Sequence, residues 1–181
     1  MIGEPSTRGV VEGLDYNHNN RLMEESMPKK PDFDLQAAHK YFAALCFNAA
    51  WDLIEKPDRT PEDDEQMIRL SLTSHWHWTQ RDDYDSEKAS IGYWQASRVY
   101  AILGEADNAR KYGQMCLTAS DSEEVEAFYL GFAYEALARA ESVAGNREKM
   151  NEYLAMAREA ADRVKMVEER KMLEEDLDTI T

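Results

Sequence analysis

Apolar residues recur every three or four positions along most of the chain, the spacing that gathers them on one face of an α-helix. The pattern predicts six helices, over residues 34–55, 61–80, 86–103, 106–118, 121–144 and 146–163. Residues 164–180 contain neither Gly nor Pro, and they either extend the sixth helix or form a seventh. No segment alternates in the manner of a strand, so we expect an all-α fold of six to seven helices.

Several predicted helix ends carry the residue types that cap helices. Thr60 stands before Pro61 and a run of acids, which is typical of a helix start. Ser120, followed three residues later by Glu123, predicts a capping box that begins the fifth helix. The other predicted ends are N-caps at Ser86 and Asn146 and C-terminal glycines at Gly104 and Gly145.

The first predicted helix carries two apolar stripes. One stripe consists of Leu35, Ala38, Phe42, Leu45, Ala49 and Leu53. The second lies about a quarter turn away and consists of Tyr41, Ala44, Asn48 and Trp51. Because apolar faces of helices are normally buried, we expect this helix to be covered on more than one side.

Small residues and glycines recur at a fixed interval in the second half of the chain. Gly104 is followed 41 residues later by Gly145, and the buried positions after each glycine correspond in the same way. The corresponding pairs are Ala109 with Met150, Gly113 with Leu154 and Cys116 with Ala157. This offset predicts a helical hairpin that is repeated in register, and therefore a stack of hairpins rather than a simple bundle.

Residues 92–117 resemble a tetratricopeptide repeat (TPR). Around a turn at Gly104, Tyr93, Ala96, Ser97 and Tyr100 match the large-small-small-aromatic positions of the first TPR helix, and Ala109, Gly113 and Cys116 match the small positions of the second. The chain also resembles small, poorly characterised bacterial TPR-like proteins, through Phe47-Asn48-Ala49-Ala50-Trp51 and Tyr93-Trp94-Gln95-Ala96-Ser97-Arg98. The resemblance implies a short right-handed solenoid over residues 32–181, divergent because its offset exceeds the TPR period of about 34. In such a solenoid the first, third and fifth helices line a groove.

Charge narrows the classes of partner. The formal net charge is −15, and basic residues never cluster in groups of more than two, so we expect neither nucleic acid nor a membrane as partner. Residues 1–31 are polar, without a helical or strand period, and are interpreted as an irregular arm. They lack the apolar core of a signal peptide, which predicts a cytoplasmic protein.

Two histidines raise the question of a metal. His75 and His77 are two residues apart, which on a helix directs their rings to nearly opposite sides, whereas chelation favours a separation of three or four. Sharing a metal would require a third ligand such as His39 or Glu135. Cys46 and Cys116 are isolated, so no metal or other cofactor is expected.

The predicted groove carries aromatic and charged residues that suit a ligand site. The candidate residues are Asn48 and Trp51 on the first helix, His77 beside the third, Trp94, Gln95 and Arg98 on the third, and Glu135 and Arg139 on the fifth. They would suit a peptide with a free carboxylate or a small anionic molecule. Alternatively, Arg98 and Glu135 form only an ion pair between helices, with Arg139 as a surface partner of Glu135.

No catalytic motif is recognisable in the sequence. The main hypothesis is therefore a non-catalytic helical-repeat module that binds a peptide or partner protein in the groove, with a homodimer possible. The alternative is an enzyme, or a sensor of a small molecule or metal, with a pocket around His77, Arg98 and Glu135. A third hypothesis is a structural unit whose dimer interface uses the same surface.

Overall fold

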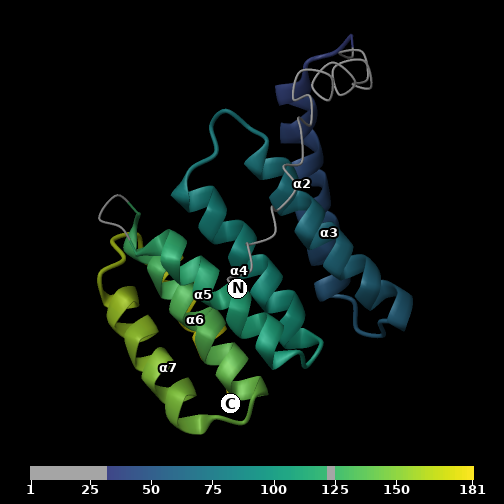
Figure 1. Cartoon of the computed structure of the whole chain (residues 1–181). Coiled ribbons are helices and arrows are strands. Elements are labelled where there is room, and N and C mark those ends of the chain that lie inside the picture. The colour runs from purple at the N-terminus through teal and green to yellow at the C-terminus, as the bar shows by residue number, and fades with distance from the viewer. Residues whose placement is uncertain (1–31, 122–124) are drawn as a thin grey trace, which may run out of the picture. The chain divides into compact units, whose positions relative to one another are not determined.

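The computed structural model describes residues 32–121 and 125–181, and within these ranges every regular element is a helix. The all-α prediction is confirmed for them, whereas the predicted irregular arm at 1–31 lies outside the described residues. The helices are α2 (Leu35–Ile54), α3 (Pro61–Thr79), α4 (Ser86–Ile102), α5 (Ala106–Ser120), α6 (Ala127–Val143), α7 (Arg147–Asp162) and α8 (Val167–Leu177) (Figure 1). None of the helices in these ranges is long and apolar enough to cross a bilayer.

The predicted start of α3 is confirmed in detail. The Asp63 backbone N–H donates to Thr60 Oγ1 at 3.3 Å, and the Thr60 N–H donates to Asp63 Oδ2 at 2.8 Å. This reciprocal pair satisfies two N–H groups that the helix leaves without partners. Asn146 caps α7 as predicted, but α4 is capped by Asp85, one residue before the expected Ser86.

The predicted start of α6 is wrong. The helix begins at Ala127, with Glu126 as its N-cap, and Ser120 is instead the last residue of α5. The Ser120 hydroxyl lies 2.7 Å from Ser90 Oγ on α4 and 2.9 Å from the Cys116 carbonyl oxygen. These contacts engage the side chain that a capping box would need, and Glu123 lies outside the described residues.

The 41-residue offset corresponds to a repeated turn. Gly104 and Gly145 have φ angles of +76° and +71°, the left-handed region that glycine adopts without steric cost. After each glycine, the next backbone N–H donates across the turn at 2.9 Å, from Glu105 to the Tyr100 carbonyl and from Asn146 to the Glu141 carbonyl. Both hairpins, α4–α5 and α6–α7, are therefore closed by the same glycine C-cap.

Helices pack against their neighbours in the chain, and α4 also packs on α6. Small residues allow the close approaches. A Cβ on Gly113 would lie 3.0 Å from Leu137 Cδ2, so α5 approaches α6 where only glycine fits without adjustment. The small residues Ala109 and Cys116, on the same face as Gly113, are fully buried.

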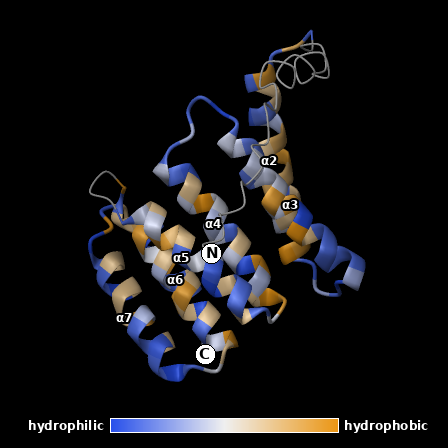
Figure 2. Ribbon diagram, in the orientation of Figure 1, coloured by the Kyte–Doolittle hydropathy of each residue, from blue (hydrophilic) through white to orange (hydrophobic). Residues whose placement is uncertain are grey.

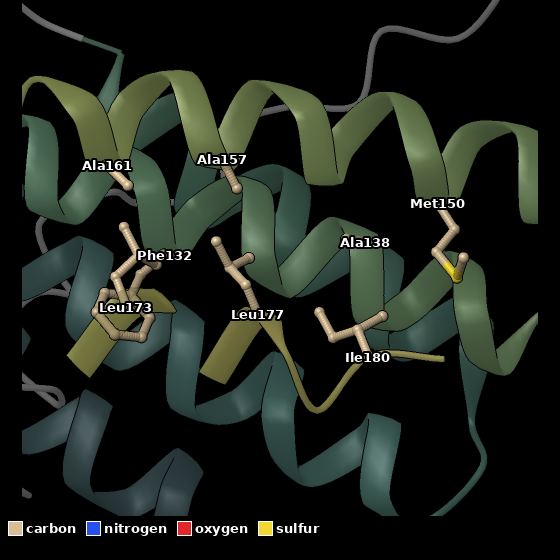
Figure 3. Packing of buried hydrophobic residues seen from close by; sticks show 8 residues of the cluster. All are labelled: Phe132, Ala138, Met150, Ala157, Ala161, Leu173, Leu177 and Ile180. Atoms are coloured by element: carbon tan, nitrogen blue, oxygen red, sulfur yellow. The ribbon is translucent and has the colours of Figure 1, made fainter. Parts of the chain in front are cut away.

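Within residues 164–180, Val167–Leu177 form a separate seventh helix rather than an extension of the sixth. The chain leaves α7 after Asp162, and α8 packs over both α6 and α7. Its Leu173 and Leu177, with Ile180, point into a cluster with residues of α6 and α7: Phe132, Ala138, Met150, Ala157 and Ala161 (Figure 3). The C-terminal helix thus buries the apolar faces of α6 and α7.

The expectation that α2 is covered on more than one side is wrong for its first half. Leu35, Phe42 and Leu45 of one predicted stripe are exposed, as is Tyr41 of the other. Only Ala43 and Ala50 are fully buried in α2. The reason is that α2 meets α3 through small residues, so larger hydrophobic side chains elsewhere on α2 stay exposed. Figure 2 shows that hydrophobic and hydrophilic residues both occur along α2.

Candidate functional site

A carboxylate lies buried between the helices that the sequence assigned to a groove. Glu135 on α6 has no exposed surface. Its Oε1 accepts from Arg98 Nη1 of α4 at 2.9 Å and from Arg139 Nε, one turn further along α6, at 2.7 Å. Its Oε2 accepts from the Trp94 indole N–H at 2.9 Å. Three donors therefore compensate the loss of hydration of this charge.

The C-terminal helix completes the network. Asp176 on α8 accepts from Arg98 Nη2 at 2.5 Å, and its carbonyl oxygen accepts from Arg139 Nη2 at 3.2 Å. Arg139 Nη2 also donates to Thr179 Oγ1 at 2.8 Å. The two arginines consequently join α4, α6 and α8.

These charges are engaged within the protein. The Arg98 side chain is only 11% exposed and bonds two carboxylates, so the ion pair considered as the alternative for Arg98 and Glu135 is present. An external carboxylate that binds Arg98 Nη2 would have to displace Asp176. The network therefore positions the helices rather than offering a free anion site.

Aromatic rings form a continuous row across α2, α4 and α6. Successive ring centroids lie 6.5 Å apart from Phe47 to Trp51, 5.6 Å from Trp51 to Trp94, 5.1 Å from Trp94 to Phe132 and 4.9 Å from Phe132 to Phe128. These spacings are those of favourable edge-to-face and tilted aromatic contacts. The row therefore joins α2, α4 and α6 through aromatic contacts.

A cavity of about 230 Å³ opens at the Trp94–Phe128 end of this row. It is lined by Ser90, Ile91, Trp94, Phe128, Tyr129, Phe132 and Met172. The lining is almost entirely apolar, and its one buried hydroxyl, Ser90, is already hydrogen-bonded to Ser120. Because the cavity is smaller than the 300–1,000 Å³ typical of drug-sized ligands, it fits a group about the size of one side chain.

The structure brings six of the eight predicted site residues together. Trp94, Arg98, Glu135 and Arg139 form the network, Trp51 contacts the Trp94 ring, and the Gln95 amide donates to the Phe47 carbonyl oxygen at 3.1 Å. Gln95 is buried and therefore ties α4 to α2. The other two, Asn48 and His77, have different surroundings.

Asn48 is exposed and lines a shallow depression along α2. His77 Nδ1 lies 2.9 Å from His39 Nδ1, and its ring stacks on Phe42. Within the described ranges, no hydrogen bond or ring contact joins His77 to Arg98 or Glu135.

His75, not His77, meets α4. The His75 ring lies over Gly92, where an added Cβ would be 1.9 Å from His75 Nδ1. The centroid of the His75 ring is 4.3 Å from the centroid of the Tyr93 ring. Burial lowers the pKa of His75, and its Nδ1 has no hydrogen-bond partner. Of the ligands considered for a shared metal, only His39 reaches His77, and the described residues include no group of three His, Cys, Asp or Glu side chains that could hold an ion.

Sequence reasoning missed that α8 contributes to the site and that Tyr129 lines the cavity. Met172 lines the cavity, and Asp176, one turn further on, closes the charge network. The available signal was the spacing of Met172, Asp176 and Thr179, which places all three beside the buried Leu173–Leu177 stripe.

No protein-family model, curated protein or solved structure matches the chain.

Proposed function

We propose that the chain is a non-catalytic, TPR-like helical module that binds a peptide segment of a partner protein across α2, α4 and α6. One apolar side chain of that segment would enter the cavity beside Trp94. The observation that carries this proposal is the cavity itself, with aromatic rings on its walls and no charge pointing into it.

The saturated charge network favours an apolar anchor over the carboxylate or small anion expected from sequence. Arg98 and Arg139 already bond Glu135 and Asp176, whereas no side chain of the described residues fills the cavity. Burying one large apolar side chain contributes about 1.5–3 kcal/mol, which alone gives only weak binding. Further contacts along the aromatic row are therefore part of the proposal.

The alternative hypothesis is an enzyme or sensor. It requires a pocket around His77, Arg98 and Glu135, and it has less support. His77 pairs with His39, whereas Arg98 and Glu135 pair with each other. No observation on these residues favours a reaction.

The test uses the Trp94 indole N–H, whose NMR resonance reports directly on the cavity. Titration with N-acetyl-phenylalaninamide or N-acetyl-leucinamide is expected to shift this resonance, whereas N-acetyl-glutamate amide leaves it in place. Met172→Arg, which puts a charged side chain at the cavity rim, should remove the shift.

The matched control is Met156→Arg on α7, which changes an exposed methionine outside the cavity lining. It should behave as the unmodified chain. Equal responses in the two variants, or a response to the acidic amide alone, would contradict the proposal.

A further inference from the structure

The first half of α2 presents an apolar surface to solvent. Tyr41 is 63% exposed and Leu45 is 47% exposed, and both line a shallow depression of about 520 Å³. Its lining consists of Ala37, Lys40, Tyr41, Ala44, Leu45 and Asn48, which we call the α2 seam. The seam is contiguous with exposed Phe42, and this apolar area on one helix is of the kind that marks an interaction surface.

The seam differs in charge from the chain as a whole. The formal net charge is −15, so two copies repel each other over most of their surfaces. The seam contains no acid, and its only formal charge is Lys40. It is therefore a surface on which two copies can approach with little repulsion.

The positions of the seam residues along α2 have the same spacing when they are counted in either direction. If two α2 helices run antiparallel about a twofold axis between Phe42 and Ala43, each seam residue faces another seam residue. Tyr41 of one copy then faces Ala44 of the second, Leu45 faces the aliphatic stem of Lys40, and Ala37 faces Asn48. Tyr41 thus meets a small residue and Leu45 meets an aliphatic stem, so the seam is complementary to itself, as a twofold interface requires.

We infer from this pattern that two copies of the chain pair antiparallel through the α2 seam. Tyr41, Phe42 and Leu45 are about half exposed, and together with the smaller seam residues they offer on the order of 500 Å² per copy. The total of about 1,000 Å² lies at the lower limit for a specific interface, so we expect a dimer that dissociates at micromolar concentration.

Sedimentation equilibrium of the full chain between about 1 and 200 μM tests the inference. The expected result is a mass that rises from the 20.8 kDa of one chain toward twice that value. Ala44→Glu, which puts an acid opposite Tyr41 of the second copy, should hold the mass at one chain. Met156→Glu, the same kind of charge change at an exposed site on α7, should leave the dimer intact.

Salt separates an apolar seam from an ionic one. Because both copies are acidic, raising NaCl from 50 to 500 mM should strengthen the association by screening their repulsion. A dimer that weakens with salt, a dimer that survives Ala44→Glu, or a single-chain mass up to 200 μM would each overturn the inference.

Cross-linking tests the orientation even if Ala44→Glu disturbs the fold, which circular dichroism would reveal. In a chain with Cys46→Ser, a mixture of Tyr41→Cys and Ala44→Cys should form disulfide-linked pairs faster than either variant alone. Faster pairing of Ala44→Cys with itself would indicate a parallel arrangement and overturn the antiparallel one. Met172→Arg lies outside the seam and should leave the dimer unchanged, so this inference and the proposed peptide site fail independently.

Discussion

Apolar side chains are buried at the C-terminal end of the described helices and exposed at the other end. At the C-terminal end, α8 covers α6 and α7, and its Leu173 and Leu177 are almost completely buried. In the α2–α3 hairpin, Tyr41 and Leu45 of α2 stay exposed. A helix with a hydrophobic face buries it only where a neighbour supplies a matching surface, and α8 supplies one for α6 and α7.

The amino-acid compositions of α8 and α2 agree with this difference in burial. The sequence of α8, VEERKMLEEDL, places most of its charged residues, Asp176 excepted, away from its leucines, which suits contact with water. The sequence of α2 has only Lys40 and Asp52 as formal charges among 20 residues. One helix is thus suited to terminate a stack, and the other is suited to continue it onto another surface.

The largest expected effect comes from removing the side chain that seals the C-terminal end. Leu173→Ala should lower the free energy of unfolding by about 3–4 kcal/mol, because it leaves a cavity where Leu173 Cδ2 now lies against Gly131. Urea unfolding followed by circular dichroism measures the loss.

The matched change in the other region is Leu45→Ala. Since Leu45 is already half exposed, we expect a loss below about 1 kcal/mol under conditions where the chain is monomeric. Equal losses for the two leucines would mean that the two ends are covered alike.

Removing the buried charge of Glu135 should lower the free energy of unfolding by somewhat less than Leu173→Ala does. Glu135→Gln leaves Arg98 and Arg139 without their shared carboxylate and should cost about 3 kcal/mol in the free energy of unfolding. The control is Glu65→Gln in α3, whose ion pair with Arg69 is exposed on both sides and is worth a few tenths of a kcal/mol. If Glu135→Gln behaves like the control, the network does not hold α4, α6 and α8 together.

The smallest effect is a pH dependence that belongs to the α2–α3 hairpin. Burial lowers the pKa of His75, and burial together with the charge of His39 lowers the pKa of His77. Both groups bind fewer protons in the folded chain than in the unfolded one as the pH falls below 6.5, so the free energy of unfolding decreases in that range. The urea midpoint should therefore be lower at pH 5.5 than at pH 7.5.

His75→Gln and His77→Gln should each reduce this difference. Carboxyl groups do not account for it, because those with a lowered pKa, such as Glu141 beside Arg110, act only below 4.5. A difference that is unchanged in both variants would remove the histidines as its cause.

Local features of the fold were predictable because they depend on neighbouring residues. Thr60 and Asp63 form the capping pair that their spacing predicts, and Gly104 and Gly145 close the two repeated turns. The start of α6 was not predictable in this way, because Ser120 bonds to Ser90, 30 residues earlier in the chain.

The sequence by itself determined the all-helical fold, the place of most helices, the repeated turns and the presence of aromatic and charged residues on α4 and α6. Only the tertiary structure decided that Arg98 and Arg139 share Glu135 beside Asp176, that Met172 borders an apolar cavity, and that no described residue covers the seam on α2. The physical reason is distance along the chain. Periodicity and caps act over three or four residues, whereas the network and the cavity depend on how α8 packs on α6. Arg139 and Asp176, which meet there, are 37 residues apart.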